Sequence, residues 1–128
     1  MSDMRTSREQ TVRHLYAAYL DDRKDIVGAM LTEDFTFSSP RDDHIDRATY
    51  FERCWPKEPV FSSFDIEFLA IDGDEAVIRY RAEKLDGGSF RNIESFRFRG
   101  DKIASVDVYF GRNGDRPLFT GAALPMCR

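Results

Sequence analysis

The sequence predicts an α+β domain in which three N-terminal helices pack on a strongly curved, mostly antiparallel sheet that forms a cone-shaped half-barrel. Up to Trp55 the apolar residues recur mainly at helical spacing. After Phe61 they alternate with polar residues, which is typical of half-buried strands. Three turn signals, Asp72-Gly73, Asp86-Gly87-Gly88 and Gly100-Asp101, divide that second part into long spans that hairpins can join.

The N-terminal part indicates two helices. Thr6 and Glu9 have the spacing of a capping box, so we expect a first helix over residues 6–20 whose apolar side chains are Val12, Leu15, Tyr16 and Tyr19. Asp22 is the expected N-cap of a short second helix, whose apolar side carries Ile26, Val27, Met30 and Leu31.

A brief strand and a third helix are expected next. Phe35 and Phe37 alternate with polar residues, and the strand should end at Ser38, Ser39 and Pro40. Asp46 can cap a helix that Pro56 stops, with a buried face of Ala48, Phe51, Cys54 and Trp55.

For the strands after Phe61, the alternation of apolar and polar residues predicts the core-facing side with different clarity. In residues 90–99 the core-facing set should be Phe90, Asn92, Glu94, Phe96 and Phe98. In the last strand one face holds Ala104, Val106, Val108 and Phe110, and the other holds Ser105, Asp107 and Tyr109. The strand over residues 75–85 stays open, because either Ala76, Ile78, Tyr80 and Ala82 or Val77, Arg79, Arg81 and Glu83 could face inward.

Composition limits the classes of function. The chain has 128 residues, enough for one domain over residues 1–128. A net charge of −4 disfavours nucleic-acid binding, and no apolar stretch is long enough for a membrane helix. The two cysteines lack the spacing of metal ligands, and we expect neither a metal nor a cofactor. A chain with so few cysteines is expected in the reducing cytoplasm.

Two stretches of the sequence resemble a known superfamily. Residues 25–37, DIVGAMLTEDFTF, look like its second helix and following strand, and residues 93–98, IESFRF, with Lys102-Ile103 and Tyr109-Phe110-Gly111, look like its last two strands. This is the nuclear transport factor 2-like superfamily, which includes SnoaL-like cyclases and ketosteroid isomerase. The resemblance covers residues 8–111 and implies a cone-shaped domain with a pocket for a small molecule.

The resemblance to ketosteroid isomerases implies roles for particular residues. Their first-helix tyrosine, an oxyanion donor, corresponds to Tyr16, with Tyr19 as the other candidate. Their second donor, a protonated Asp, corresponds to Glu94. Their general base is an Asp before a Pro, where this chain has Ser39 before Pro40, and a serine is not a base near neutral pH.

A second resemblance concerns the strand whose inward face is open. Arg81-Ala82-Glu83 is similar to the inward Arg-x-Asp of limonene-epoxide-hydrolase-like enzymes, which would turn Arg79, Arg81 and Glu83 into the cone. Those enzymes need a further Asp where this chain has Val108.

The candidate catalytic residues are therefore Glu94, Tyr16, Arg81 and Glu83, and the candidate ligand-binding residues are Tyr19, Phe37, Ser39, His44, Phe51, Trp55, Phe96, Val108 and Phe110. Burying an ionised Glu94 on an aromatic face is costly, so either its pKa is raised or a cation lies near it. A structural ion pair with Arg79 or Arg81 is therefore the alternative to a functional role. His44 lies in an expected loop at the mouth of the cone, where it is either an acid–base group or an exposed residue.

We expect a pocket protein that binds a small, largely apolar, oxygen-bearing molecule. Whether it is an isomerase, a cyclase or a hydrolase, or instead a non-catalytic dimeric ligand-binding or protein-interaction module of the same fold, stays open. A homodimer is expected through the outer sheet face, where Ile93, Ile103 and Tyr109 are expected to lie among polar residues. The apolar tail, residues 112–128, is expected to pack on the domain or on a partner subunit.

Overall fold

The computed structural model describes residues 2–111, and their side chains from Met4 onward. Along that part of the chain the elements are α1 (Ser2–Leu20), α2 (Lys24–Met30), β1 (Leu31–Ser39), β2 (Asp42–Asp46), α3 (Arg47–Cys54), β3 (Phe61–Asp72), β4 (Glu75–Lys84), β5 (Ser89–Arg99) and β6 (Lys102–Phe110). The strands form one sheet in the order β2-β1-β6-β5-β4-β3. Only the β1–β6 pair is parallel, so the described sheet is mixed but mostly antiparallel, as predicted.

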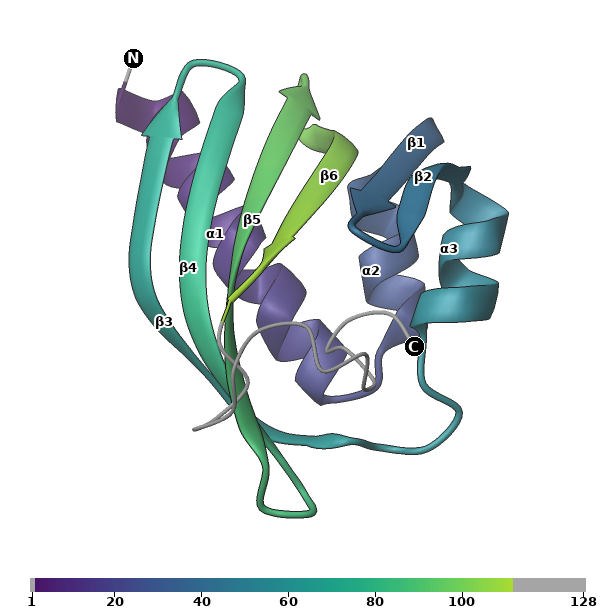
Figure 1. The fold of residues 1–128 in the computed structure, drawn as a ribbon. Helices are drawn as coiled ribbons and strands as arrows, with labels where there is room; N and C mark the ends of the chain where they lie inside the picture. Colours follow the sequence, from purple (N-terminus) through teal and green to yellow (C-terminus); the bar gives the residue numbers. More distant parts are fainter. Residues whose placement is uncertain (1, 112–128) are drawn as a thin grey trace.

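The long strands curve around α1, which lies against one face of the sheet (Figure 1). At the other end of the sheet, α3 packs beside β1 and β2. The opposite, outer face of β3 to β6 carries no helix of the described chain in Figure 1. The concave side under α1 is therefore the place where the core and any interior site lie.

The helix starts differ from two of the predicted caps. The first helix begins at Ser2, so Thr6 and Glu9 lie inside it instead of capping it. Its early turns are held to two hairpin turns by Arg8, which is buried and donates hydrogen bonds to the carbonyls of Gly73 and Gly100. This tertiary contact fixes the N-terminal half of α1 against the sheet.

Asp22 is not the N-cap of α2, because Arg23 occupies that position. Asp22 takes a left-handed conformation, with φ of 60°, and its carboxylate accepts a hydrogen bond of 2.7 Å from the indole of Trp55. The prediction for Asp46 is confirmed, because its side chain accepts a 2.8 Å hydrogen bond from the amide of Thr49 at the start of α3.

The region between α2 and α3 contains more strand than predicted. The strand around Phe35 and Phe37 is the nine-residue β1. Residues 42–46, predicted to be a loop, form β2, because Phe37 pairs with Ile45 in an antiparallel ladder. In α3 the buried residues are Tyr50 and Cys54, whereas Ala48, predicted to be buried, is exposed.

The structure decides which residues face inward on each long strand. The predicted face of β5 is confirmed, with Phe90, Asn92, Glu94, Phe96 and Phe98 all buried. On β4 the inward set is Ala76, Ile78, Tyr80 and Ala82. The expectation that Ile103 lies on the outer face is wrong, because a register shift between Arg97 and Phe98 of β5 lets both Ile103 and Val106 of β6 turn inward.

Aromatic side chains fill the space between α1 and the sheet. Tyr16 from α1 meets Phe64 of β3 at a centroid distance of 5.5 Å and Tyr80 of β4 at 5.0 Å. The ring of Phe96 on β5 lies 6.4 Å from that of Tyr16, centroid to centroid.

No helix within residues 2–111 is long and apolar enough to span a membrane. The predicted packing of residues 112–128 concerns a segment outside the described residues.

Candidate functional site

Glu94 lies at the centre of a buried hydrogen-bond network on the concave face. Only 1% of its surface is exposed. Tyr16 of α1 donates to Glu94 Oε1 at 2.6 Å, and Tyr80 of β4 donates to Oε2 at 2.8 Å. Asn92, two residues before Glu94 on β5, donates to the hydroxyl of Tyr80 at 3.2 Å. Both carboxyl oxygens therefore have a phenol partner, and three separate elements hold them in place.

The electrostatics of this network follow from burial. Loss of water raises the pKa of Glu94 to about 7, although the hydrogen bonds from Tyr16 and Tyr80 act to lower it. Burial and the neighbouring Glu94 charge also raise the pKa of both tyrosines well above its ordinary value. Glu94 can therefore exchange a proton near neutral pH, while both phenols stay protonated.

Glu94 is not part of a structural ion pair within the described chain. The two arginines that could have neutralised it, Arg79 and Arg81, lie on the opposite face of β4. Arg79 contacts Glu67 at 3.2 Å and Arg81 pairs with Glu83. The alternative of a buried pair with either arginine is thus excluded.

This placement corrects the inward orientation expected for Arg81 and Glu83. Both side chains are partly exposed on the outer face and bond to each other. The physical reason is the apolar set on β4, since inverting the strand would bury two arginines and expose Ile78 and Tyr80. The Arg-x-Glu motif is therefore absent from the concave side.

The predicted ligand-binding residues fall into separate groups. Phe96 and Val108 are buried on the concave sheet face, and Val108 pairs directly with Glu94 across β5 and β6. Tyr19 is buried near α3, where its hydroxyl donates to the carbonyl of Cys54 at 2.9 Å and its ring lies 4.8 Å from Trp55. Phe37 packs on Tyr50 at 5.0 Å.

Phe51 and His44 lie apart from the Glu94 network, whereas Phe110 lies at its edge. Phe51 is half-buried and borders a cleft between α2 and α3. Phe110 pairs with Asn92 across β5 and β6 and borders a groove beside Ile93 and Tyr109. His44 is exposed, with its Nδ1 atom 2.6 Å from Asp43. No group of residues able to hold a metal ion occurs within residues 2–111.

Ser39, which the sequence resemblance aligns with the isomerases' general base, is hydrogen-bonded to a carboxylate. Its hydroxyl donates to Asp42 Oδ2 at 3.0 Å. Asp42 is itself buried, and Arg53 lies 2.8 Å from its Oδ1 atom, close enough for an ion pair but not aligned as a hydrogen bond. Asp42 was not among the predicted site residues, because its burial depends on the pairing of β2 with β1, which was not predicted.

Tyr80 is the other residue that sequence reasoning missed. The sequence left open which face of β4 points inward, so the neighbours of Tyr80 could not be predicted. The Asp86-Gly87-Gly88 turn could have identified them, because the hairpin register places Tyr80 opposite Asn92 and Ile78 opposite Glu94. That register, combined with the clear faces of β5, selects the inward set of β4.

A small cavity lies at the edge of the aromatic core. It has a volume of about 20 Å³ and lies between the end of α1, residues 55–60 and the start of β3, where Tyr19, Trp55 and Phe61 help to line it. It has room for about one water molecule. Glu94 is not among its lining residues.

Comparisons with known proteins agree on the fold. The SnoaL-like domain family matches residues 12–106. A candidate ketosteroid isomerase from Kribbella flavida superimposes with a TM-score of 0.73 at 15% identity, covering 96% of this chain and 95% of that one. An NTF2-like protein from Anabaena variabilis has a TM-score of 0.63 at 26% identity, with 85% and 90% covered.

An LEH-like epoxide hydrolase from M. tuberculosis has a TM-score of 0.67 at 18% identity, covering 82% of this chain and 83% of that one. No curated protein matches the chain. The structural likeness to isomerase-like and hydrolase-like proteins thus concerns the cone fold, and the chemistry has to be argued from this chain's own residues.

Proposed function

The chain belongs to the SnoaL-like domain family, and we propose that it binds a small, largely apolar molecule through an oxygen atom placed beside Glu94. The observation that carries this proposal is a fully buried carboxyl group whose partners within residues 2–111 are two phenols and not a cation. Burying such a group costs stability, and perturbed acids of this kind are concentrated at functional sites.

The proposed role of Glu94 is to share a proton with the ligand oxygen. With a pKa of about 7, the carboxyl group is protonated in a large fraction of molecules at neutral pH. A protonated carboxyl donates a strong hydrogen bond to a carbonyl or enolate oxygen in an apolar site. Tyr16 already points its hydroxyl at the same place, so it can supply a second donor when a ligand oxygen replaces its contact with Glu94.

The base expected for isomerase chemistry is missing from its usual position. Ser39 cannot accept a proton near neutral pH, and the adjacent Asp42 is paired with Arg53. Binding and polarisation of an oxygen need only the donors, whereas proton transfer between carbons needs a free base. We therefore expect oxyanion binding without appreciable isomerisation of a β,γ-unsaturated ketosteroid.

We infer that the ligand reaches Glu94 from the edge of the aromatic core. The cavity between Tyr19, Trp55 and Phe61 is too small for an organic ligand, but it adjoins the ring stack that leads to Tyr16 through Phe64. The connecting segment, residues 55–60, contains no helix or strand. We propose that this segment is displaced when the ligand enters.

Binding of substituted phenols as oxyanion mimics tests the proposal. Glu94→Gln keeps a donor and should weaken binding modestly, whereas Glu94→Ala should weaken it by about 1 to 3 kcal/mol, the usual cost of an unpaired buried polar group. Glu83→Gln makes the same carboxyl-to-amide change on the outer face and should have no effect. Equal phenol affinities of the parent and Glu94→Ala would remove Glu94 from any ligand role.

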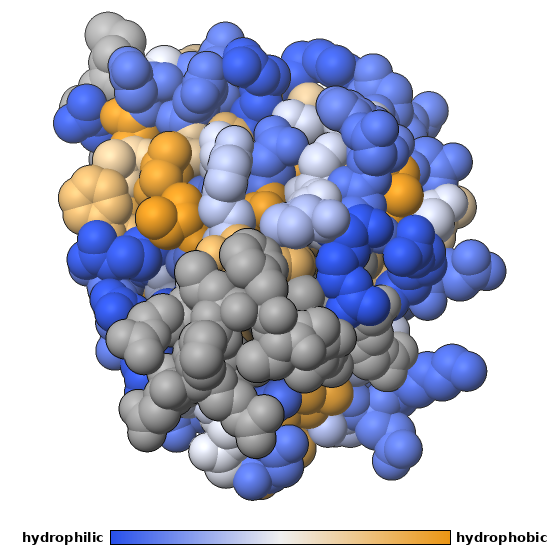
Figure 2. Space-filling view, viewed as in Figure 1, coloured by the Kyte–Doolittle hydropathy of each residue, from blue (hydrophilic) through white to orange (hydrophobic). Residues whose placement is uncertain are grey.

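A second candidate, a dimeric binding module, is favoured by the outer face of the sheet. Phe68, Ile93 and Tyr109 are exposed by 50%, 41% and 60%, and together with Arg79 they stand in one row across β3 to β6. Figure 2 shows apolar side chains gathered over these strands among hydrophilic ones. We propose that a second copy of the chain covers this row.

Sedimentation tests the dimer without reference to ligand binding. The parent is expected to sediment as a dimer at micromolar concentration, and Ile93→Asp is expected to shift it to the monomer. A parent that sediments only as a monomer would contradict this second candidate.

A further inference from the structure

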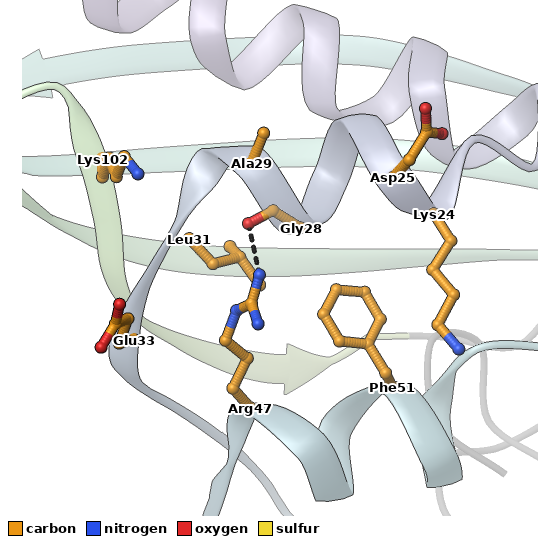
Figure 3. A pocket seen from close by; sticks show the side chains of 9 residues that line it. All are labelled: Lys24, Asp25, Gly28, Ala29, Leu31, Glu33, Arg47, Phe51 and Lys102. Carbon is orange, nitrogen blue, oxygen red and sulfur yellow. Dashed lines mark hydrogen bonds between the residues drawn. The ribbon is translucent and has the colours of Figure 1, made fainter.

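A second cleft lies on the outside of the helical layer, away from Glu94. It has a volume of about 650 Å³, within the range of small-molecule sites. Its walls come from α2, the start of α3, the first residues of β1 and the first residue of β6 (Figure 3). None of Glu94, Tyr16 and Tyr80 borders it, so it is independent of the interior network.

The cleft collects basic side chains that lack acidic partners. Lys24, Arg47 and Lys102 line it, and none of the three makes an ion pair with a carboxylate in the described part of the chain. Most other arginines there do make one. Of the two acids in the lining, Asp25 is bound by Arg23 at 3.0 Å. The cleft is thus a positive site on a chain with a net charge of −4.

Arg47 is fixed in position, but one of its hydrogen-bond donors is unpaired within residues 2–111. Its Nη2 atom donates to the carbonyl of Gly28 at 2.7 Å, and its guanidinium lies 5.7 Å from the ring centre of Phe51. Its Nε atom is buried and has no hydrogen-bond partner among residues 2–111. An unpaired buried donor is costly, and an anion bound beside the same guanidinium would offset part of that cost electrostatically.

Gly28 and Phe51 shape the space around this guanidinium. A Cβ atom on Gly28 would lie 3.1 Å from Arg47 Nη2, so the glycine allows the close approach. The Nζ atom of Lys24 lies 5.4 Å from the same Phe51 ring. Figure 3 shows the ring between Arg47 and Lys24, with Lys102 across the cleft. A flat apolar surface therefore adjoins two cationic groups, and a third lies across the cleft.

We propose that this cleft binds a small organic monocarboxylate whose apolar body packs on Phe51. The carboxylate accepts hydrogen bonds from Arg47, for which a planar guanidinium is well suited, and Lys24 and Lys102 add electrostatic attraction. The lining residues carry one more positive charge than negative, which favours a monoanion over a dianionic phosphate ester.

Fluorescence of Trp55 gives a direct readout, because it is the only tryptophan and its ring lies 6.0 Å from Phe51. Benzoate is the probe, benzyl alcohol is the neutral control of similar shape, and phenyl phosphate is the dianion control. Benzoate should bind more tightly than both and lose affinity as salt is added. Equal binding of benzyl alcohol, or tighter binding of phenyl phosphate, would overturn the assignment.

Variants locate the site. Lys102→Ala and Lys24→Ala change exposed residues and should each weaken benzoate binding about threefold to tenfold, whereas Arg47→Lys should weaken it at least about tenfold. Arg5→Ala removes an exposed cation outside the cleft and should change nothing. Glu33→Gln, which removes a negative charge from the lining, should strengthen binding. Loss of affinity in Arg5→Ala equal to that in Lys102→Ala would show that benzoate responds only to overall charge and would overturn the proposal.

Glu94→Ala separates this cleft from the interior site. It should leave benzoate affinity unchanged while weakening phenol binding. If Glu94→Ala abolished benzoate binding, the carboxylate would belong to the interior site and the cleft proposal would be wrong.

Discussion

Replacing Glu94 with glutamine should make the protein more stable at neutral pH and about 1 kcal/mol less stable in acid. The pKa of Glu94 is about 7 in the folded protein, against an ordinary value of 4.5. Because the folded state holds this proton more tightly, the contribution of Glu94 to stability is fully present below pH 4.5 and is lost as the pH rises through 7. The difference corresponds to about 3 kcal/mol.

Glutamine has nearly the same shape and carries no charge at any of these pH values. Its carbonyl can accept from one of the two tyrosines that now bond to Glu94, and its amide can donate to the other. We therefore expect Glu94→Gln to exceed the parent by about 2 to 3 kcal/mol above neutral pH, after allowing about 1 kcal/mol for a poorer hydrogen bond.

Urea unfolding of both proteins between about pH 4.5 and pH 8 measures the difference in unfolding free energy. Exposed acids such as Asp34 and Glu67, whose pKa values lie below the ordinary range, contribute equally to both proteins and cancel. Glu83→Gln should give a flat difference curve. A flat curve for Glu94→Gln as well would refute the view that Glu94 is a buried acid with a raised pKa.

Three further predictions test the network, a helix cap and a strand register. Tyr16→Phe removes a hydrogen bond that lowers the pKa of Glu94, so this pKa should rise above 7 in a carbon-13 NMR titration, and a fall would contradict the network. Asp46→Ala should cost about 1 kcal/mol in urea unfolding through loss of the α3 cap, whereas the exposed Asp43→Ala should cost almost nothing. Ile103→Ala should cost about 2 to 5 kcal/mol because the bulge buries this side chain, and Ile93→Ala on the outer face of the monomer should cost far less. Equal losses at these two isoleucines would show that the register of β6 is wrong.

The elements that the sequence predicts well are those in which one face is far more apolar than the other. Strand β5 alternates phenylalanines with arginines, so its inward face and the burial of Glu94 could be predicted. Strand β4 has aliphatic residues on both faces, and only its pairing with β5 decides between them. The outward turn of Arg81 and Glu83 therefore depends on tertiary register, which local alternation does not encode.

The remaining differences also come from long-range contacts. Ile103 faces inward because of an irregularity in the β5–β6 ladder, which has no local signal in the sequence. Asp22 serves Trp55 and does not cap α2, because α3 brings the indole to it. For the site, the resemblance to ketosteroid isomerases implied a common role for Tyr16 and Glu94. The structure brings these two residues together and adds Tyr80 as the second phenol.

The side-chain carboxyl carbon of Glu94, followed by NMR through a pH titration with and without a bound phenol, tests the central claim most directly. The account predicts a titration midpoint near 7 in the free protein, set by burial, and a displaced midpoint when the phenol oxygen takes a hydrogen bond from this group. A midpoint near the ordinary 4.5 that does not move when phenol is added would contradict it.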